Sequence, residues 1–336
     1  MLKRSYFAAA NGYTGFRSYF DNIFISESFK QIFVLKGGPG TGKSTLMKRV
    51  ADFATSTDLD CDMIYCSSDP DSLDGVIVYT KRGKYAVIDG TAPHQRDAVI
   101  PGAIDIIINL GDNFDISLLE SRRNEIMALN EKKKMAYGEA YSYLRAAGAI
   151  NSKIVELIQK DFNYEKAMHI ASKIESFSPT ESDSTQIALR RAFCKLGYYT
   201  LDDYTSINTI FRVSGRYGEE MMFLQLFLDK IRQKAKLISF DPLNKNAPDG
   251  IVLNNISYIC TSDQGAEFDA GECLKLTANR DELNTLKEMH DSLLVLAQRY
   301  FEKATLLHSD LEAIYRSSID FTKNDIAING IIKYIL

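Results

Sequence analysis

A glycine-rich segment near the start of the chain constrains the fold more than any other feature. Residues 37–44 read GGPGTGKS, a full match to the pattern G-x-x-x-x-G-K-[ST]. The run before it, Gln31 to Leu35, is apolar and rich in β-formers, as a buried strand is. Leu46, Val50 and Phe53 follow at the spacing of one helix face. The sequence therefore predicts a strand, a glycine loop and a helix in that order.

The residue types in this loop suit a polyphosphate. Glycines let the backbone turn tightly and aim its N–H groups inward, and the following helix adds the positive end of its dipole. Lys43 can reach β- and γ-phosphates, and the Ser44 hydroxyl can ligate a Mg²⁺ ion that bridges them. We expect an ATP site with Mg²⁺ here. The glycines concerned are Gly37, Gly38, Gly40 and Gly42.

Asp89 is the candidate for the acidic residue on the magnesium side and the second expected metal ligand beside Ser44. It ends the strand-like run from Lys84 to Ile88. The alternative is that Asp89 caps the next turn, since Asp-Gly is a common turn pair. Asp112 is the rival, but the pattern of segment 101–108 favours the start of a helix and its buried face.

Two further residues are candidates for proton or water chemistry. Asp69 lies in the acidic stretch from Asp69 to Asp74, which follows a predicted strand ending at Tyr65. Ligands bind at the carboxyl ends of strands in open α/β sheets, so Asp69 could polarise water or accept a proton; it could equally cap a helix. His94 could contact the γ-phosphate or water, or hold a loop. The other histidines lie in helical patterns and are interpreted as structural or surface residues: His169, His290 and His308.

The chain also repeats itself. Ile32-Phe33 matches Ile210-Phe211, and in this register the glycine loop aligns with GRYGEEMM at residues 215–222. The second loop lacks the lysine and the hydroxyl and carries Glu219 and Glu220, whose charges would repel phosphates. We therefore expect no productive triphosphate binding there, and a structural role for this half. Three more echoes support the repeat: Ser68–Pro70 with Phe240–Pro242, Asp74–Val78 with Asp249–Leu253, and Tyr85–Asp89 with Ser257–Thr261.

A heptad pattern follows each half. It runs from Leu119 to Leu157 with Arg122 and Lys133 as its only breaks. Adding 157 to these positions gives a second pattern from Leu283 to Ile314, in which His290 is the one polar exception. Each half therefore predicts a long helix or a helical hairpin, with Gly148 as a candidate bend in the first.

The expected fold class is α/β, with two tandem P-loop NTPase-like α/β cores, each followed by a long heptad-patterned helix or helical hairpin. Polar residues and lost periodicity put the boundary near 178–191. We expect residues 1–185 to form the core with the active loop and residues 186–336 the degenerate repeat, and the two repeats to pair within the molecule. Arg212 or Arg216 is a candidate arginine finger for the first loop.

Composition sets the remaining limits. Lys plus Arg is 40 and Asp plus Glu is 44, so the charge argues against a nucleic-acid partner, and the basic cluster Lys132–Lys134 is interpreted as a solvated helix face. Five scattered cysteines without a C-x-x-C pair indicate neither a zinc site nor a disulfide framework. No apolar run approaches the roughly 20 residues of a membrane span, and none resembles a signal peptide. We expect a soluble cytoplasmic protein with no membrane partner.

Four segments together resemble an uncharacterised family of bacterial tandem P-loop ATPases: IFVLKGGPGTGKSTLMKRV, YCSSDPDSLDGVIV, VIDGTAPH and INLGD. The resemblance covers essentially the whole chain and is stronger in the first half. The motifs with Asp69, Asp74, Asp89 and His94 match as well, but the resemblance assigns them no role. It implies ATP binding through Gly37, Gly38, Pro39, Gly40, Thr41, Gly42, Lys43, Ser44 and Thr45.

Three functions are compatible with these features. The leading one is Mg²⁺-dependent ATP hydrolysis at the first loop, with Lys43 holding the γ-phosphate and an acidic residue or His94 orienting water. The second is a phosphotransferase, or kinase, whose acidic stretch at Asp69 activates an acceptor hydroxyl. The third is a nucleotide-gated module without hydrolysis that binds an unknown protein through its helical segments, although heptads of this length are more typical of an intramolecular core.

Overall fold

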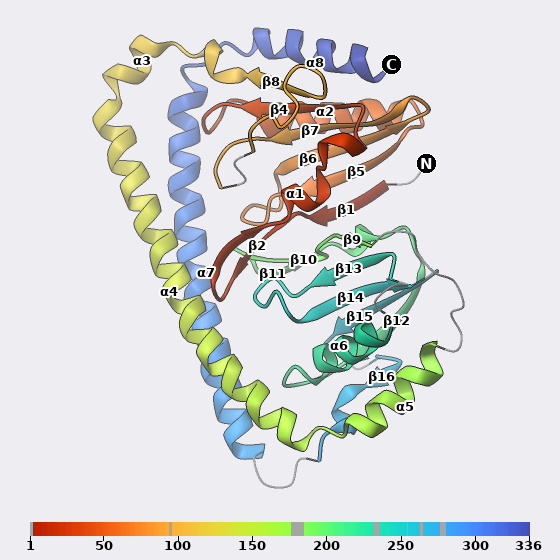
Figure 1. The fold of residues 1–336 in the computed structure, drawn as a ribbon. Helices are drawn as coiled ribbons and strands as arrows, with labels where there is room; N and C mark the ends of the chain where they lie inside the picture. Colours follow the sequence, from red (N-terminus) through yellow and green to blue (C-terminus); the bar gives the residue numbers. More distant parts are fainter. Residues whose placement is uncertain are drawn as a thin grey trace.

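The computed structural model describes residues 3–93, 96–175, 185–231, 235–253, 255–262, 265–275 and 280–336. These residues form two six-stranded mixed sheets that meet edge to edge, where Phe7 pairs with Leu189, with shorter helices packed on the sheets and two long helices along one side (Figure 1). The expected duplicated α/β architecture is therefore present. The expected boundary at residue 185 falls beside residues 176–184, which lie outside the described part.

The first sheet has the strand order β1 (Lys3–Phe7), β5 (Asp60–Tyr65), β6 (Leu73–Thr80), β7 (Gly83–Asp89), β4 (Gln31–Lys36) and β8 (Asp105–Asn109). Strand β4 lies between β7 and β8 and is parallel to both. After β4 the chain passes through the glycine loop into α2 (Lys43–Ser56), whose Leu46 and Val50 are buried. The predicted order of strand, loop and helix is confirmed.

The prediction that a helix begins near Pro101 is wrong. Residues 105–109 form β8, which pairs with β4 from Ile32 with Asp105 to Lys36 with Asn109. Three consecutive isoleucines are β-branched and prefer a strand, where they pack on a pleated surface. This correction matters for Asp112, because that residue follows a strand beside β4 after all.

The second sheet repeats the first. Its order is β9 (Gln186–Ile187), β13 (Leu237–Phe240), β14 (Pro248–Leu253), β15 (Ile256–Thr261), β12 (Thr209–Ser214) and β16 (Phe268–Asp269), with the same pattern of parallel and antiparallel neighbours. Leu35 pairs with Asp89, and the equivalent Val213 pairs with Cys260. Asp89 therefore corresponds to Cys260 and not to Thr261; the β14–β15 hairpin is shorter than β6–β7, which displaced the sequence match by one residue.

The two sheets share one apolar core. Ile32, Val34 and Ile88 from the first sheet pack in the same cluster as Leu237 and Val252 from the second. On the opposite face of each sheet, the helices are exchanged between the halves. Helix α8 (Thr322–Ile335), at the end of the chain, joins α2 on the first sheet. Helix α5 (Tyr164–Glu175), from the first half, joins α6 (Glu219–Ile231) on the second.

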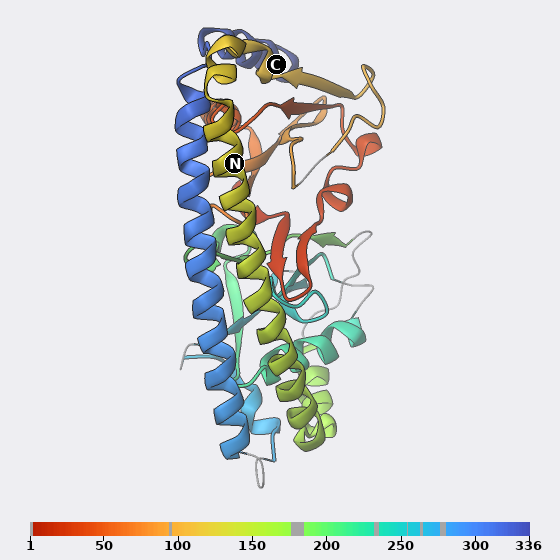
Figure 2. The same cartoon turned by 90° about the vertical axis from the view of Figure 1, so that its left-hand side faces the viewer.

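The long helices are α4 (Arg123–Asp161) and α7 (Arg280–Arg316), and they run antiparallel past both sheets (Figures 1 and 2). The heptad prediction of long helices is confirmed, with the short helix α3 (Ile116–Ser121) preceding the break at Arg122. Gly148 is not a bend, because α4 continues through it. A Cβ there would lie 2.7 Å from the Cβ of Tyr13, so this glycine makes room for the tyrosine.

Two small hairpins link the halves. One is β2 (Ala9–Gly12) with β3 (Gly15–Ser18), followed by the short helix α1 (Phe20–Ile23); the other is β10 (Arg191–Cys194) with β11 (Gly197–Thr200). The hairpins pack on each other, and their turns reach the opposite half at Tyr13 and Lys195. Among the described helices, none has the length and apolar character needed to cross a membrane.

Candidate functional site

The glycine loop, residues 37–42, connects β4 to α2. Two of its positions have backbone conformations that only glycine adopts without strain. Gly40 and Gly42 have φ angles of +68° and +84°, which are left-handed. A Cβ on Gly40 would lie 2.6 Å from the carbonyl oxygen of Glu312, in the last turns of α7. The loop is therefore pressed against a helix from the other half of the chain.

Lys43 turns its ammonium into this loop, and Ser44 follows it on the first turn of α2. The Lys43 ammonium donates to the carbonyls of Gly37 (2.9 Å) and Gly38 (3.0 Å) and lies 3.7 Å from Asp89 Oδ2. The Ser44 hydroxyl oxygen accepts a 2.9 Å hydrogen bond from the backbone of Leu73. A lysine, a hydroxyl and a carboxylate thus converge where the dipole of α2 begins, which suits a divalent cation shared with an anionic ligand.

Asp89 caps the next turn and also faces Lys43. Its Oδ1 accepts hydrogen bonds from the Thr91 backbone (2.8 Å) and hydroxyl (2.6 Å), so it caps the next turn. Its Oδ2 faces Lys43. Asp112, the rival, accepts a 2.6 Å hydrogen bond from Asn109 beyond the end of β8. His94 lies outside the described residues.

Asp69 is held by a lysine from the other half of the chain. Lys195, in the turn of the β10–β11 hairpin, donates to Asp69 Oδ1 at 2.6 Å and lies 3.7 Å from Asp71. The second carboxylate oxygen of Asp69 accepts a 3.3 Å hydrogen bond from the Ser72 hydroxyl. The structure thus places Asp69 near the site but does not leave it free as a base.

Helices α4 and α7 bring further basic groups to the first site. His308 lies 3.5 Å from the Lys133 ammonium, and burial, Lys133 and Lys43 together lower the pKa of His308. Burial also lowers the pKa of Lys133. Sequence reasoning missed both residues, because it predicts a solvated face for Lys133 and a structural or surface role for His308. The signal in the sequence was that Lys133 breaks the heptad pattern.

Helix α8 supports the glycine loop by a hydrogen bond. Asn324 of α8 is buried and donates to the Thr41 carbonyl at 2.9 Å. Thr41 is itself buried and donates to the Gly38 carbonyl. Pro39 is half-buried, and Thr45 is exposed on the first turn of α2. The loop is therefore preorganised by contacts from both halves.

The equivalent loop of the second half, residues 215–218, is closed by its own side chains. The Glu219 carboxylate is 2% exposed and accepts hydrogen bonds from the backbone N–H groups of Arg216 (2.9 Å) and Tyr217 (2.7 Å). An internal carboxylate thus occupies N–H groups that an anionic ligand would need. Burial and the charge of Glu219 raise the pKa of Glu220 to about 7.

Neither arginine expected as a finger reaches the first loop. Arg212 pairs with Glu267 at 3.5 Å, and Arg216 lies over the ring of Tyr217 at 5.4 Å. Both pairs lie within the second half, because β12 and the loop after it belong to the second sheet. A basic residue that this half does contribute is Lys195, which pairs with Asp69.

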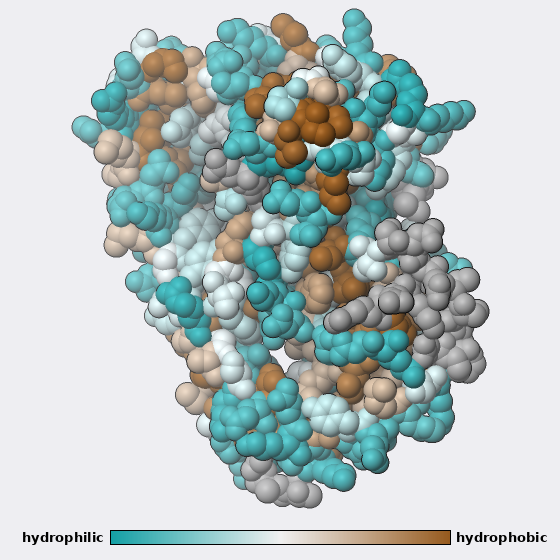
Figure 3. Space-filling model, in the orientation of Figure 1, coloured by the Kyte–Doolittle hydropathy of each residue, from teal (hydrophilic) through white to brown (hydrophobic). Residues whose placement is uncertain are grey.

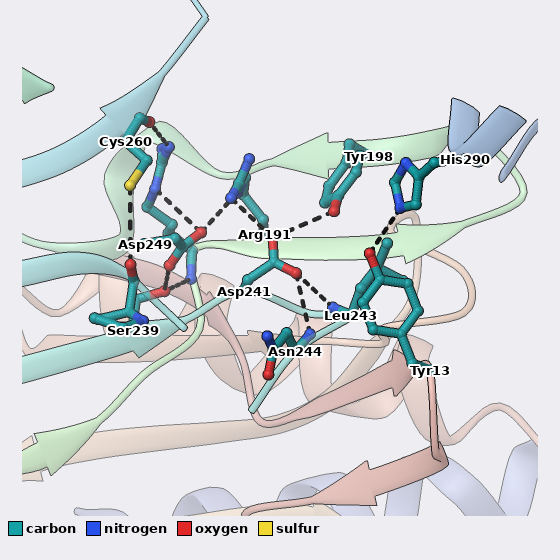
Figure 4. A network of polar contacts seen from close by, with 12 residues as sticks. Tyr13, Arg191, Tyr198, Ser239, Asp241, Leu243, Asn244, Asp249, Cys260 and His290 are labelled. Atoms are coloured by element: carbon teal, nitrogen blue, oxygen red, sulfur yellow. Dashed lines mark hydrogen bonds and ion pairs between the residues drawn. The ribbon is translucent and has the colours of Figure 1, made fainter. Parts of the chain in front are cut away.

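A buried polar network stands beside the second loop (Figure 4). Arg191 donates to Asp249 (2.6 Å) and Asp241 (3.0 Å), and Tyr198 donates to Asp241 (3.3 Å). Burial opposes the charge of Arg191, but the two carboxylates outweigh it and raise its pKa. Tyr13 lies 2.8 Å from His290 Nε2, which joins α7 to the first hairpin.

The backbone hydrogen bonds of Asp241 also correct the sequence match of Ser68–Pro70 with Phe240–Pro242. Asp241 donates its backbone N–H to Ala247, as Cys66 donates to Ser72. Asp241 is therefore the counterpart of Cys66 and not of Asp69. The two loops have the same length, and the shared Asp-Pro pair is displaced by three positions.

A metal at the first loop would need ligands from outside the protein. In the described part of the chain, no group of three or more His, Cys, Asp or Glu is placed to hold an ion. Mg²⁺ commonly takes only one or two protein ligands and completes its shell with water and substrate phosphates. Ser44 and Asp89 fit that pattern.

Comparisons with known proteins reach only part of the first half. The family described as Nephrocystin 3, N-terminal, matches residues 17–76, which is less than a fifth of the chain and includes β4, the glycine loop and α2. The match stops before Asp89 and does not touch the second half, so the resemblance to a tandem family stays a prediction. Searches of curated proteins and of solved structures found no match.

Proposed function

We propose that the first glycine loop binds ATP with Mg²⁺ and that the chain hydrolyses ATP there. The observation that carries this proposal is the position of Lys43, whose ammonium lies inside the loop with Ser44 next to it and Asp89 Oδ2 3.7 Å away. In this arrangement the Lys43 ammonium would bind the β- and γ-phosphates. The match of residues 17–76, which spans the same loop, is compatible with it.

Each polar group has a defined task in this proposal. Ser44 would ligate Mg²⁺, and Asp89 would hold the ion's water shell or orient the attacking water. Bound Mg²⁺ neutralises charge that develops on the phosphates. Lys133 of α4 would add positive charge near the phosphates, with His308 of α7 beside it. The backbone N–H groups of Gly38 and of residues 40–43 would cradle the phosphates.

Hydrolysis is favoured over transfer to a hydroxyl because of Asp69. A kinase needs a free carboxylate to take the acceptor proton, whereas Asp69 is engaged by Lys195 at 2.6 Å. A module without hydrolysis is separated by experiment. Tight ATP binding without turnover would indicate that module, and ADP production that requires an added hydroxyl compound would indicate a kinase.

The test is steady-state ATP turnover with Mg²⁺ in wild type, Lys43→Ala and Lys48→Ala. We expect Lys43→Ala to lower kcat/KM by about 100-fold or more, since it removes the main charge on the transferred phosphate. Lys48 is the matched control: it lies on α2 as well, but its ammonium donates to the Asp71 carbonyl on the exposed side. Turnover by Lys43→Ala at the wild-type rate would refute the proposal.

A further inference from the structure

A cavity lies at the second loop. It has a volume of about 820 Å³ and is bounded by the loop, α6, both long helices and the Tyr13 turn. Figure 3 shows the surface hollowed in the lower half of the view, between the long helices and the second core. Glu220, Arg191 and Asp241 line it. A volume of this size accommodates a small organic molecule.

Most charged groups in the cavity wall already have partners. Arg191 is paired with Asp241 and Asp249, and the Lys287 ammonium contacts Asp291. Glu220 differs from them, because its Oε2 is buried and has no hydrogen-bond partner among the described residues. A buried carboxyl oxygen without a partner is a costly feature that a ligand carrying N–H donors would relieve.

Anions do not fit this wall. The N–H groups of Arg216 and Tyr217, which would hold a phosphate, are taken by Glu219. Met221 occupies the position of Lys43, so the lysine of the first site has no counterpart. Glu219 and Asp241 add negative charge near Glu220, and both help to raise its pKa. A phosphate placed here would face three acidic side chains.

Aromatic rings complete the wall. Tyr13, Tyr164, Tyr198 and Tyr217 all line the cavity. Two of these rings already carry a guanidinium over one face: Arg191 lies 5.0 Å from the Tyr198 centroid, and Arg216 lies 5.4 Å from the Tyr217 centroid. Tyr164 is 43% exposed, so its ring is open to a ligand. Tyrosine faces next to a carboxylate are the chemistry that binds organic cations.

We propose that the cavity at residues 215–220 is a binding site for a small organic cation, an amine or amidine with an apolar or aromatic body and no phosphate. The Glu220 carboxylate would take the charged N–H group, and the tyrosines and Met221 would hold the body. The second half would thus bind a cation at the position where the first half would bind phosphate. This proposal does not depend on ATP binding at the first loop.

The test uses benzamidine, and benzamide as its uncharged counterpart of the same shape, in titration calorimetry of the full chain at pH 8. We expect benzamidine to bind wild type at least about tenfold more tightly than benzamide, a difference of about 1.4 kcal/mol. Glu220→Gln should weaken benzamidine binding by about tenfold or more. Glu282→Gln, an exposed glutamate on the first turn of α7, is the matched control and should leave it unchanged.

Two further variants locate the bound cation within the fold. Tyr164→Ala removes an exposed ring that lines the cavity and should weaken benzamidine binding several-fold with the fold intact by circular dichroism. Lys43→Ala should bind benzamidine as wild type does, which separates this site from the first loop. Equal binding of benzamide and benzamidine, undiminished binding by Glu220→Gln, or preferential binding of pyrophosphate to the second loop would each overturn the proposal.

Discussion

The two glycine loops occupy the same place in the same sheet order, yet different charged side chains surround them. Around the first, Lys43, Lys133 and Lys195 supply cations, and His308 lies among them. Around the second, the Glu219 carboxylate accepts hydrogen bonds from the loop's own N–H groups, and Glu220 lies nearby with a raised pKa. The comparison teaches that a duplicated fold can keep its topology while the charged side chains at one of its loops are replaced.

The exchanged helices make each loop depend on the other half. The first loop rests on α7 and α8, which follow the second sheet in the sequence. The second loop lies beside α4, which follows the first sheet. The contacts are not equally tight, because Gly40 touches α7 backbone whereas the equivalent Gly218 has only the flexible end of Met221 nearby, at 3.7 Å.

The largest expected effect comes from this difference in packing. Gly40→Ala should destabilise the fold by about 3 kcal/mol or more, because it adds a backbone clash to a left-handed conformation. Gly218→Ala, at a φ of +105°, should cost about 1–2 kcal/mol from backbone strain alone. Urea unfolding of both variants measures the contrast. Equal losses would mean that α7 does not press on the first loop.

The second effect is the pH dependence contributed by Glu220. Its folded pKa of about 7 lies above the ordinary value of 4.5, so the folded state binds more protons between these two values. Stability from this group therefore falls as pH rises from about 4.5 to 7. Glu220→Gln removes that loss and should be more stable than wild type by about 2–3 kcal/mol at pH 8.

At pH 4.5 the advantage of Glu220→Gln should largely disappear, because the wild-type carboxyl is then neutral when folded. Urea unfolding at the two pH values, with Glu282→Gln as the exposed control, measures it. An advantage that is the same at both values would show that the carboxyl is not buried as described.

The smallest effect concerns the lysine that crosses between the halves. Lys195→Ala should raise the KM for ATP by about two- to fivefold with little change in kcat, since an ion pair that is partly exposed contributes about 1 kcal/mol or less. Lys153→Ala, on the exposed face of α4, is the control and should change nothing. A loss of kcat alone would instead assign Lys195 a role in the chemical step.

Local patterns in the sequence were sufficient for much of the fold. The apolar run before the loop, the helix face after it and both long helices follow directly from residue periodicity. The prediction for the isoleucines at 106–108 was wrong because a short apolar stretch can form a helix or a strand, and the β-branched preference for a strand was not given enough weight. Only the pairing of β8 with β4 decides between them.

The sequence predicts the candidate-site residues that lie within a local motif, but not those that distant segments bring to the loop. Lys43, Ser44 and Asp89 follow from their own motifs, whereas Lys195 and His308 reach the loop through the exchanged hairpin and helix. One signal was present in the sequence. The 157-residue offset places Lys133 at the same helical position as His290, so the two polar interruptions of the heptads mark equivalent points, one beside each loop.

The central claim is that one loop binds ATP and its counterpart does not. The most direct measurement is equilibrium binding of a non-hydrolysable ATP analogue with Mg²⁺ to the full chain, with stoichiometry from titration calorimetry. We predict one site per chain in wild type and none in Lys43→Ala, with Met221→Ala still binding one. Two sites per chain, or one site that survives Lys43→Ala, would contradict this claim.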